Sequence, residues 1–372
     1  SGTFGNFNNQ FENLFSKTVG NKYGITFNSG TGTLQAGLSA VGVGYGDEVI
    51  TTPLTVISNL YVILALNAIP VFADIDKDTF NIDPDSIKSK ITKKTKAIMP
   101  VALYGLPCDL LKIKKISKKF KIPIILDAAE AHMAEINNTS IAKFADITSY
   151  STENSKQIST GDGGIVTTDN EIYAKKIRQY GSLGYASLPS NDGRIRKLKN
   201  IFQDPNYKRH DSFGYNFRMP ELAAAVGLAQ TEKIKNFIKL RIEIANIFKE
   251  VISNYKILKP QKEIKGYKNT YWTLACKLID KDISWKSFRN KYLEFGGESL
   301  YAAWTLLYNE TFVISNNWKK LCPPLYKNIY FPKCKNAEEV QSSIMQFTTN
   351  FESLKEARKH AKYLDKTLKY FS

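Results

Sequence analysis

Lys156 is the residue whose surroundings in the sequence best fit covalent chemistry. It lies within residues 150–164 (YSTENSKQISTGDGG), among small polar residues that follow a predicted strand and precede a glycine-rich turn. A lysine amine that has lost its proton can attack an aldehyde and form an imine. Most lysines of this chain are predicted surface charges, so the alternative is that Lys156 is one more of them.

A second candidate is a glycine-rich segment that opens a predicted helix. Residues 28–34 (NSGTGTL) follow a predicted strand, and backbone N–H groups at a helix start can bind phosphate when glycines permit close approach. The segment lacks the third glycine of a dinucleotide fingerprint and the Gly-Lys-Ser/Thr of a P-loop. An ordinary capped helix start is the equal alternative.

A third candidate is Asp127, at the end of the apolar segment 124–126 (IIL). Burial of a carboxylate is costly unless it meets a cation, and a protonated pyridine nitrogen would be such a partner. The alternative is a helix N-cap. Ala129 would share the face of Asp127 and leave room for a flat ring, whereas we assign no role to His132.

Strands and helices must position these residues, and they alternate in the first half of the chain. Repeated alternation predicts an α/β fold with a mostly parallel sheet covered by helices, whose ligands bind at the carboxyl ends of the strands. Predicted strands cover residues 23–28, 47–52, 70–75, 96–103 and 122–127, and predicted helices cover 31–41, 55–67, 85–91 and 110–120.

The pattern changes near residue 240. Two helices, 221–236 and 239–254, are predicted to flank this point, followed by a strand at 271–278 and a helical C-terminus over 337–368. We therefore predict a large domain over residues 1–240 and a smaller α+β domain over residues 241–372.

The composition narrows the possible partners. A net charge of +17 invites nucleic acid, an anionic membrane or a phosphorylated small molecule. No DNA-binding motif and no uninterrupted apolar span accompanies it, so we expect neither nucleic acid nor a membrane as partner. The four cysteines and three histidines lack metal-site spacing, which predicts no metal, free thiols and a cytoplasmic protein.

A phosphate-binding segment, an aspartate and a lysine, in this order, suggest pyridoxal phosphate. With them, the sequence resembles the DegT-type nucleotide-sugar aminotransferases, which have the aspartate aminotransferase fold (fold type I, with a seven-stranded sheet). The resemblance covers most of residues 1–240 and is thinner beyond. The matching segments are 28–31 (NSGT), 46–50 (GDEVI), 70–75 (PVFADI), 127–132 (DAAEAH), 156–164 (KQISTGDGG), 214–230 (GYNFRMPELAAAVGLAQ) and 334–340 (CKNAEEV).

The resemblance implies roles around the cofactor ring. Lys156 would hold the cofactor covalently and then act as proton shuttle. Asp127 would pair with the pyridinium nitrogen. Glu130 stands near the cofactor hydroxyl, where the family more often has glutamine or histidine. Val56 takes the place of an aromatic residue that commonly stacks on the ring.

The resemblance also implies how the phosphate is bound. Gly30 and Thr31 would contribute a backbone N–H and a hydroxyl, and Ser151 a second hydroxyl. Asn216 would reach the phosphate from the neighbouring subunit, which implies a homodimer.

The implied activity is transfer of an amino group from L-glutamate to a nucleotide-linked keto-sugar, with pyridoxamine phosphate as the other cofactor form. The favoured substrate is a 4-keto-6-deoxyhexose, used for lipopolysaccharide or another surface glycan. One alternative is a keto-sugar or cyclitol without a nucleotide, and another is a basic binding or regulatory protein on the same fold. Candidate substrate contacts, each equally explained by packing, are Tyr104, Tyr185, Arg218 and Tyr301.

Overall fold

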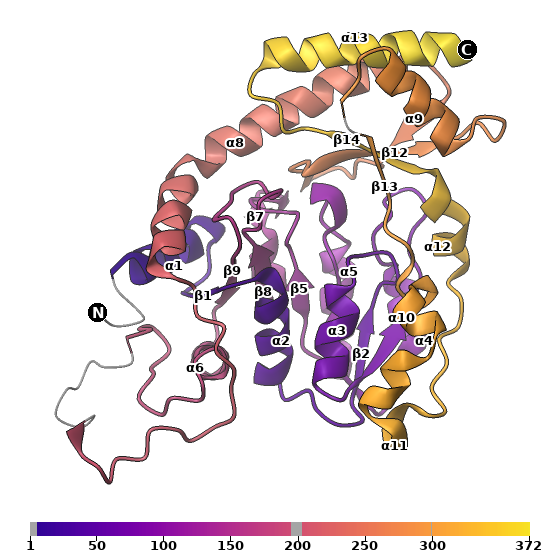
Figure 1. The fold of residues 1–372 in the computed structure, drawn as a ribbon. Helices are drawn as coiled ribbons and strands as arrows, with labels where there is room; N and C mark the ends of the chain where they lie inside the picture. The colour runs from indigo at the N-terminus through magenta and orange to yellow at the C-terminus, as the bar shows by residue number, and fades with distance from the viewer. Residues whose placement is uncertain (1–5, 195–202, 299) are drawn as a thin grey trace.

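A central sheet carries the segments predicted to do chemistry (Figure 1). The structure is a computed structural model that describes residues 6–194, 203–298 and 300–372. It contains a four-stranded sheet, β1-β9-β8-β5, and a three-stranded sheet, β3-β2-β4, joined by bridges between Ile98 and Ile124 and between Val101 and Asp127. The strands are β1 (Tyr23–Phe27), β2 (Glu48–Thr51), β3 (Ile69–Phe72), β4 (Thr95–Met99), β5 (Ile125–Asp127), β8 (Ile147–Ser151) and β9 (Gly164–Thr168).

The pairing is parallel except around β9, which runs antiparallel to both β8 and β1. Alternate side chains of a strand point to opposite faces of the sheet. Both faces carry apolar side chains, and helices cover both of them. The predicted α/β fold is confirmed. The covering helices are α1 (Asn6–Val19), α2 (Gly30–Ala40), α3 (Ser58–Ala65), α4 (Pro84–Lys90), α5 (Leu110–Phe120) and α6 (Glu171–Tyr180).

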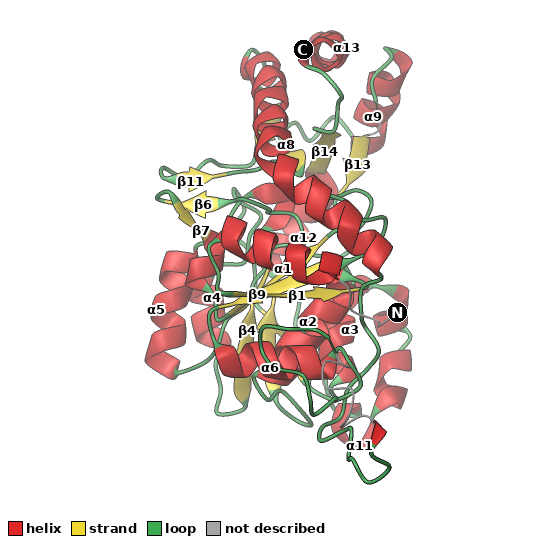
Figure 2. Ribbon diagram, turned by 90° about the vertical axis from the view of Figure 1, so that its left-hand side faces the viewer, coloured by secondary structure: helices red, strands yellow, loops and turns green. Residues whose placement is uncertain are grey.

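Two separate apolar clusters hold these layers together. On one face, Phe11 and Phe15 of α1 join Ile113 of α5 in the cluster that includes Leu126 of β5. On the other face, α2, α3 and α6 pack in the cluster that includes Ile125. Figure 2 shows α1 on one side of β1 and β9, with α2 and α6 on the other.

A long helix, α8 (Glu221–Ser253), links this sheet to a second one (Figure 1). The prediction of two helices here was wrong, because the buried side chains Ile234, Ile238 and Arg241 continue one helical stripe through the expected break. The second sheet is antiparallel, in the order β10-β12-β14-β13, and packs against α8, α9 and α13. Its elements are β10 (Leu258–Pro260), β12 (Thr273–Leu278), α9 (Trp285–Glu294), β13 (Leu300–Ala302), β14 (Ile344–Thr348) and α13 (Leu354–Phe371).

The predicted C-terminal helix is interrupted. α12 (Lys335–Val340) ends before β14, which lies between β12 and β13, and α13 begins only after it. Pairing on both edges overrides the helical tendency of this stretch, since tertiary context decides such cases.

The domain boundary near residue 240 stays a prediction. Side chains from residues 303–344, including Trp318 and Tyr326, pack with Leu60 and Phe72 near the β3 edge of the first sheet. β11 also pairs with β6, which precedes residue 240. The remaining short elements are β6 (Glu135–Ile136), β7 (Thr139–Ser140), β11 (Tyr267–Lys268), α10 (Thr311–Ile314) and α11 (Pro323–Tyr326).

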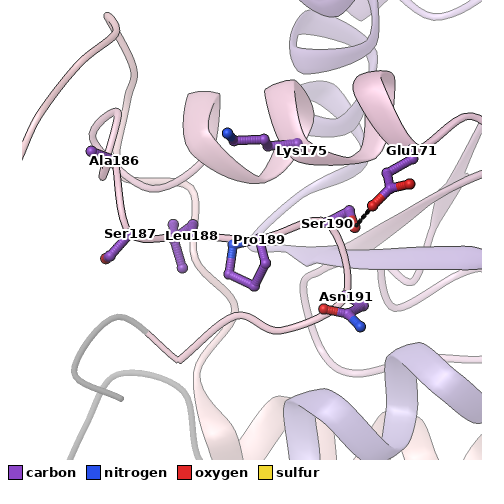
Figure 3. A pocket seen from close by; sticks show the side chains of 8 residues that line it. All are labelled: Glu171, Lys175, Ala186, Ser187, Leu188, Pro189, Ser190 and Asn191. Carbon is purple, nitrogen blue, oxygen red and sulfur yellow. Dashed lines mark hydrogen bonds between the residues drawn. The ribbon is translucent and has the colours of Figure 1, made fainter. Parts of the chain in front are cut away.

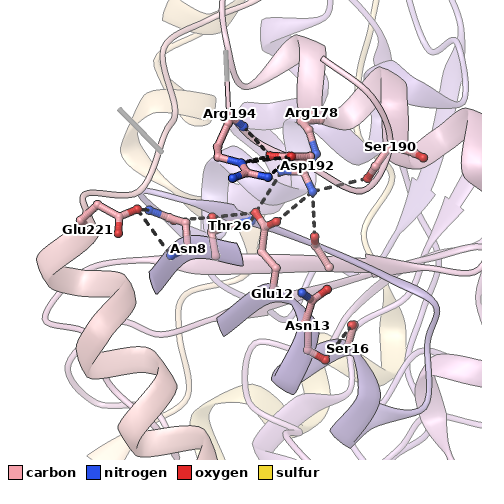
Figure 4. A network of polar contacts seen from close by, with 11 residues as sticks. Asn8, Glu12, Asn13, Ser16, Thr26, Arg178, Ser190, Asp192, Arg194 and Glu221 are labelled. Carbon is pink, nitrogen blue, oxygen red and sulfur yellow. Dashed lines mark hydrogen bonds and ion pairs between the residues drawn. The ribbon is translucent and has the colours of Figure 1, made fainter. Parts of the chain in front are cut away.

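A buried ion pair ties α1 to α6 around the edge strand β1 (Figure 4). The guanidinium of Arg178 donates to both carboxylate oxygens of Glu12, at 3.1 and 2.9 Å, and to the carbonyl oxygen of Gly24 at 3.1 Å. Glu12 also accepts the backbone N–H of Thr26 at 2.9 Å. The side chains of Arg178 and Glu12 are only 1% and 3% exposed, so neither charge has water to replace its partner.

We expect Glu12→Gln to lower the free energy of unfolding by about 3–5 kcal/mol, because it leaves the Arg178 charge buried without its partner. Glu339→Gln is the matched control: its pair with Lys77 is exposed and should contribute less than about 1 kcal/mol. Denaturant titration of both variants measures the difference. Equal, small losses would show that the buried pair contributes no more than the surface pair.

Candidate active site

The start of α2 and the end of β8 form one corner of the candidate site. Ser29 caps α2 by accepting the N–H of Gly32 at 3.1 Å. Gly30 lies so close to Ser151 that a Cβ on Gly30 would come within 2.8 Å of the Ser151 Cβ. Thr31 is exposed, and its hydroxyl lies 2.9 Å from that of Ser58. The structure therefore brings the three predicted phosphate contacts together.

Asp127 ends β5 and is 2% exposed. Its Oδ1 accepts the N–H of Ala129 at 3.0 Å, and no helix begins there, so the N-cap alternative is not what the structure shows. Burial raises the pKa of Asp127, while the Ala129 N–H, the Lys156 charge and the Asn59 amide oppose that shift. A cation at this carboxylate would stabilise its charged form.

Lys156 and Glu130 face each other beside Asp127. The Lys156 Nζ lies 3.6 Å from Glu130 Oε1, and the two side chains are 13% and 6% exposed. The second oxygen of Glu130 accepts the backbone N–H of Tyr104 at 2.8 Å. Burial raises the pKa of Glu130 to about 7, and the Lys156 charge opposes the shift. The predicted lysine and two carboxyl groups are thus one cluster.

We expect the cofactor-free protein to lose stability as the pH rises from about 4.5 to about 7. The folded Glu130 has its pKa raised from 4.5 to about 7, so the folded protein keeps a proton that the unfolded chain releases. The free energy of unfolding then falls with pH, by about 3 kcal/mol for a shift of this size. Denaturant titrations of wild type and Glu130→Gln at pH 4.5 and pH 8 test this. The same pH dependence in both proteins would contradict it.

Two tryptophans also belong to the site, and neither was predicted from the sequence. The Lys156 Nζ lies 4.1 Å from the centre of the Trp272 ring, and the Trp272 Nε1 donates to the carbonyl oxygen of Ser155 at 2.8 Å. Trp304 stacks on Trp272, and Tyr104 stacks on Trp304. Both tryptophans lie far from Lys156 in the sequence. The apolar pattern around Trp272 predicted only a strand, so no sequence signal marked either residue.

Three further predicted residues, Asn216, Val56 and Tyr104, differ in how exposed they are. Asn216 is exposed, and its neighbour Phe217 accepts the N–H of Asn28 at 2.7 Å, which places Asn216 near the phosphate corner of its own chain. Val56 is 38% exposed. Tyr104 is fully buried and stacks on Trp304, and its role as a substrate contact stays a prediction.

The other three substrate candidates differ in exposure. Tyr301 is 58% exposed, whereas Tyr185 packs on His210 with their ring centres 4.5 Å apart. Arg218 is half-buried, and its Nε and one terminal nitrogen are enclosed without a hydrogen-bond partner among the described residues. Burial lowers the pKa of Arg218. An enclosed guanidinium of this kind suits a carboxylate or phosphate.

A separate hollow of about 420 Å³ lies between α6 and residues 186–191 (Figure 3). Ser190 donates to Glu171 at 3.2 Å across one side of it, and Lys175 lines another. None of the predicted site residues lines this hollow.

The described part of the chain also contains no group of three or more potential metal ligands, and no described helix has the length and apolar character to cross a bilayer.

The cluster fits a flat pyridine ring that carries a phosphate. Backbone N–H groups at the start of α2, beside the Ser151 hydroxyl, suit the phosphate. Asp127 is buried and forms no ion pair with any of the described groups. The side-chain amide of Asn59 lies near it and is also buried, and neither its nitrogen nor its oxygen has a hydrogen-bond partner among the described residues. Lys156 supplies an amine close enough to Asp127 for its charge to affect the carboxyl group. These residues could therefore hold pyridoxal phosphate.

Comparisons with known proteins agree with this chemistry. The model of the DegT/DnrJ/EryC1/StrS aminotransferase family matches residues 1–349. The GDP-perosamine synthase of Escherichia coli O157:H7 is 35% identical over 271 residues, which are 73% of this chain and 69% of that protein.

Solved structures give the same result. An aminotransferase from Psychrobacter cryohalolentis has a TM-score of 0.85 at 26% identity, covering 98% of this chain and 92% of that chain. NtdA from Bacillus subtilis, solved with the cofactor PMP bound, has a TM-score of 0.79 at 26% identity, covering 99% of this chain and 78% of that one. The predicted cofactor and enzyme class are confirmed. The chain belongs to the DegT/DnrJ/EryC1/StrS aminotransferase family and is a pyridoxal-phosphate-dependent sugar aminotransferase.

Proposed function

We propose that the enzyme transfers an amino group from L-glutamate to a nucleotide-linked 4-keto-6-deoxyhexose, as a step toward a surface glycan. The observation that carries the proposal is the cluster of Lys156, Glu130 and Asp127 at the carboxyl ends of neighbouring strands. The name of the Escherichia coli relative, GDP-perosamine synthase, supports a nucleotide sugar as substrate.

Each residue of the cluster has a proposed task. Bound pyridoxal phosphate supplies a reactive aldehyde and a ring that stabilises negative charge at the carbon losing a proton. Lys156 would hold the cofactor through its Nζ, and the same Nζ would carry the proton that is moved. Asp127 would face the ring nitrogen, because its buried carboxylate is stabilised in its charged form by a cation. Glu130 lies beside Lys156 and would orient the ring hydroxyl.

The substrates bring anionic groups that need partners. In this proposal, Gly30, Thr31 and Ser151 bind the cofactor phosphate through neutral donors. The nucleotide diphosphate and the glutamate carboxylates then need positively charged side chains as partners. Arg218 is suited to one of them, because its guanidinium is partly enclosed without a hydrogen-bond partner among the described residues. The net charge of +17 is compatible with such substrates.

The proposed assembly is a cytoplasmic homodimer in which Asn216 contacts the neighbouring phosphate site. Asn216 is exposed, and nearby Phe213 and Leu222 are 74% and 85% exposed, as expected of residues covered by a second subunit. All four cysteines are free thiols, which supports a reducing compartment.

A substrate panel tests the proposal. The cofactor-loaded enzyme is mixed with L-glutamate and with GDP-, UDP- and dTDP-linked 4-keto-6-deoxyhexoses, and mass spectrometry detects 2-oxoglutarate and the amino sugar. Lys156→Ala is the control for enzyme-dependent product. Turnover only of cyclitols or of keto-sugars without a nucleotide would replace the proposed substrate.

A further inference from the structure

Trp272 makes two contacts with the short segment that carries Lys156. Its indole N–H donates to the carbonyl oxygen of Ser155 at 2.8 Å, next to Lys156 in the chain. Its ring lies under the ammonium group, with the Lys156 Nζ 4.1 Å from the ring centre. One side chain therefore fixes the backbone before Lys156 and also contacts the end of its side chain, an attraction favoured by the ring electrons.

Trp272 is itself held firmly. Its carbonyl oxygen accepts a hydrogen bond from Arg241 of α8 at 3.2 Å and another from the hydroxyl of Thr349 at 3.0 Å. Its ring stacks on Trp304 with ring centres 6.0 Å apart and planes 11° apart. A ring held through its backbone and through stacking on Trp304 can impose a direction on a flexible lysine.

The contacts continue back to the lysine through a second path. Trp304 stacks on Tyr104 with ring centres 6.1 Å apart, and the Tyr104 N–H is bound by Glu130. The other oxygen of Glu130 faces the Lys156 Nζ at 3.6 Å. The Lys156 ammonium group thus lies near the Trp272 ring and the Glu130 carboxylate, which are connected to each other through Trp304 and Tyr104.

We propose that Trp272 is a positioning residue that aims the amine of Lys156 at the reacting carbon. The inference rests on the proposed role of Lys156 but concerns a different residue and a different contact. A lysine has four rotatable side-chain bonds, and rate depends steeply on the placement of the reacting atoms. Trp272 restricts these bonds through the ring face and restricts the backbone through Ser155.

Trp272→Phe tests the proposal, because phenylalanine keeps an aromatic ring but cannot donate to Ser155. In the cofactor-free protein, we expect amide hydrogen exchange of residues 153–160 to become about three- to tenfold faster, the effect of one lost hydrogen bond. In the loaded enzyme, we expect kcat to fall about tenfold with little change in KM, since placement affects the reaction step more than binding. Trp285→Phe, the same change on α9, is the control and should alter neither value.

The outcomes separate positioning from support of the sheet. Faster exchange confined to residues 153–160, together with lower kcat, supports the proposal. Unchanged exchange there, or equal acceleration in β12, would overturn it, because Trp272 would then be a packing residue only. If Trp272→Phe fails to fold, Trp304→Leu removes the ring that stacks on Trp272 and must give the same pattern in weaker form. Because exchange is measured without cofactor, it is independent of whether Lys156→Ala abolishes activity.

Discussion

Replacing Lys156 by alanine should lower the turnover number by more than about 10⁴-fold, the upper range for a lost acid–base group. The loss follows from removing the only amine that lies beside both Glu130 and Asp127 among the described residues. The fold should survive, because Glu130 can take up a proton once the Lys156 charge no longer holds its pKa down. Steady-state kinetics and the visible absorbance of the reconstituted protein measure the effect.

Lys143→Ala provides the matched control. Lys143 pairs with Asp169 at the surface, at 2.7 Å, and has no contact with the cluster. Its loss should leave turnover unchanged. If Lys156→Ala retained wild-type turnover, the amine would not take part in the reaction, and the proposed role of Lys156 would be wrong.

Asp127→Asn should lower kcat by about 10²–10³-fold, the usual cost of removing one electrostatic contact to the reacting system. The amide has nearly the shape of the carboxylate but no charge to keep the ring nitrogen protonated. We also expect the visible absorbance of the bound cofactor to change, since the ring nitrogen then loses its ionic partner.

The stability of the same variant should change in the opposite direction. Burial raises the pKa of Asp127 in the folded protein, so wild type loses stability as the pH rises above the ordinary value for aspartate. Cofactor-free Asp127→Asn should therefore be at least as stable as wild type at pH 8, as measured by denaturant titration. Asp282→Asn, at an exposed position, is the control and should change neither kcat nor stability. A variant with normal kcat would show that the charge of Asp127 is dispensable.

Local sequence patterns predicted strands β1 to β5 and helices α2 to α5, but not β9, α1 or α6. α5 begins and ends at the predicted residues, because Leu110 and Ile113 mark its apolar face and Asp109 caps its start. The candidate site could also be predicted, since Gly30, Asp127 and Lys156 each lie at or shortly after the end of a strand. Parallel strands bring such positions to one edge of a sheet.

The other features of the fold and the site depend on contacts between residues far apart in the sequence, which no local pattern predicts. β14 forms a strand because β12 and β13 pair with it on both sides. Trp272 and Trp304 join the site only because the second sheet places them against the first. Whether Tyr104 faces substrate or core was left open, because a tyrosine after a strand has the same local signal in either case.

The unbroken course of α8 has a consequence for how the molecule unfolds. Its first half packs with α1, and its second half lies in the core of the second sheet, so one rod is shared by both hydrophobic interiors. A fragment ending at residue 240 would lose the side chains of residues 303–344 that cover Leu60 and Phe72, while the other fragment would lose the first half of its supporting helix. Neither half should therefore fold alone, and heating should melt the chain as a single cooperative unit.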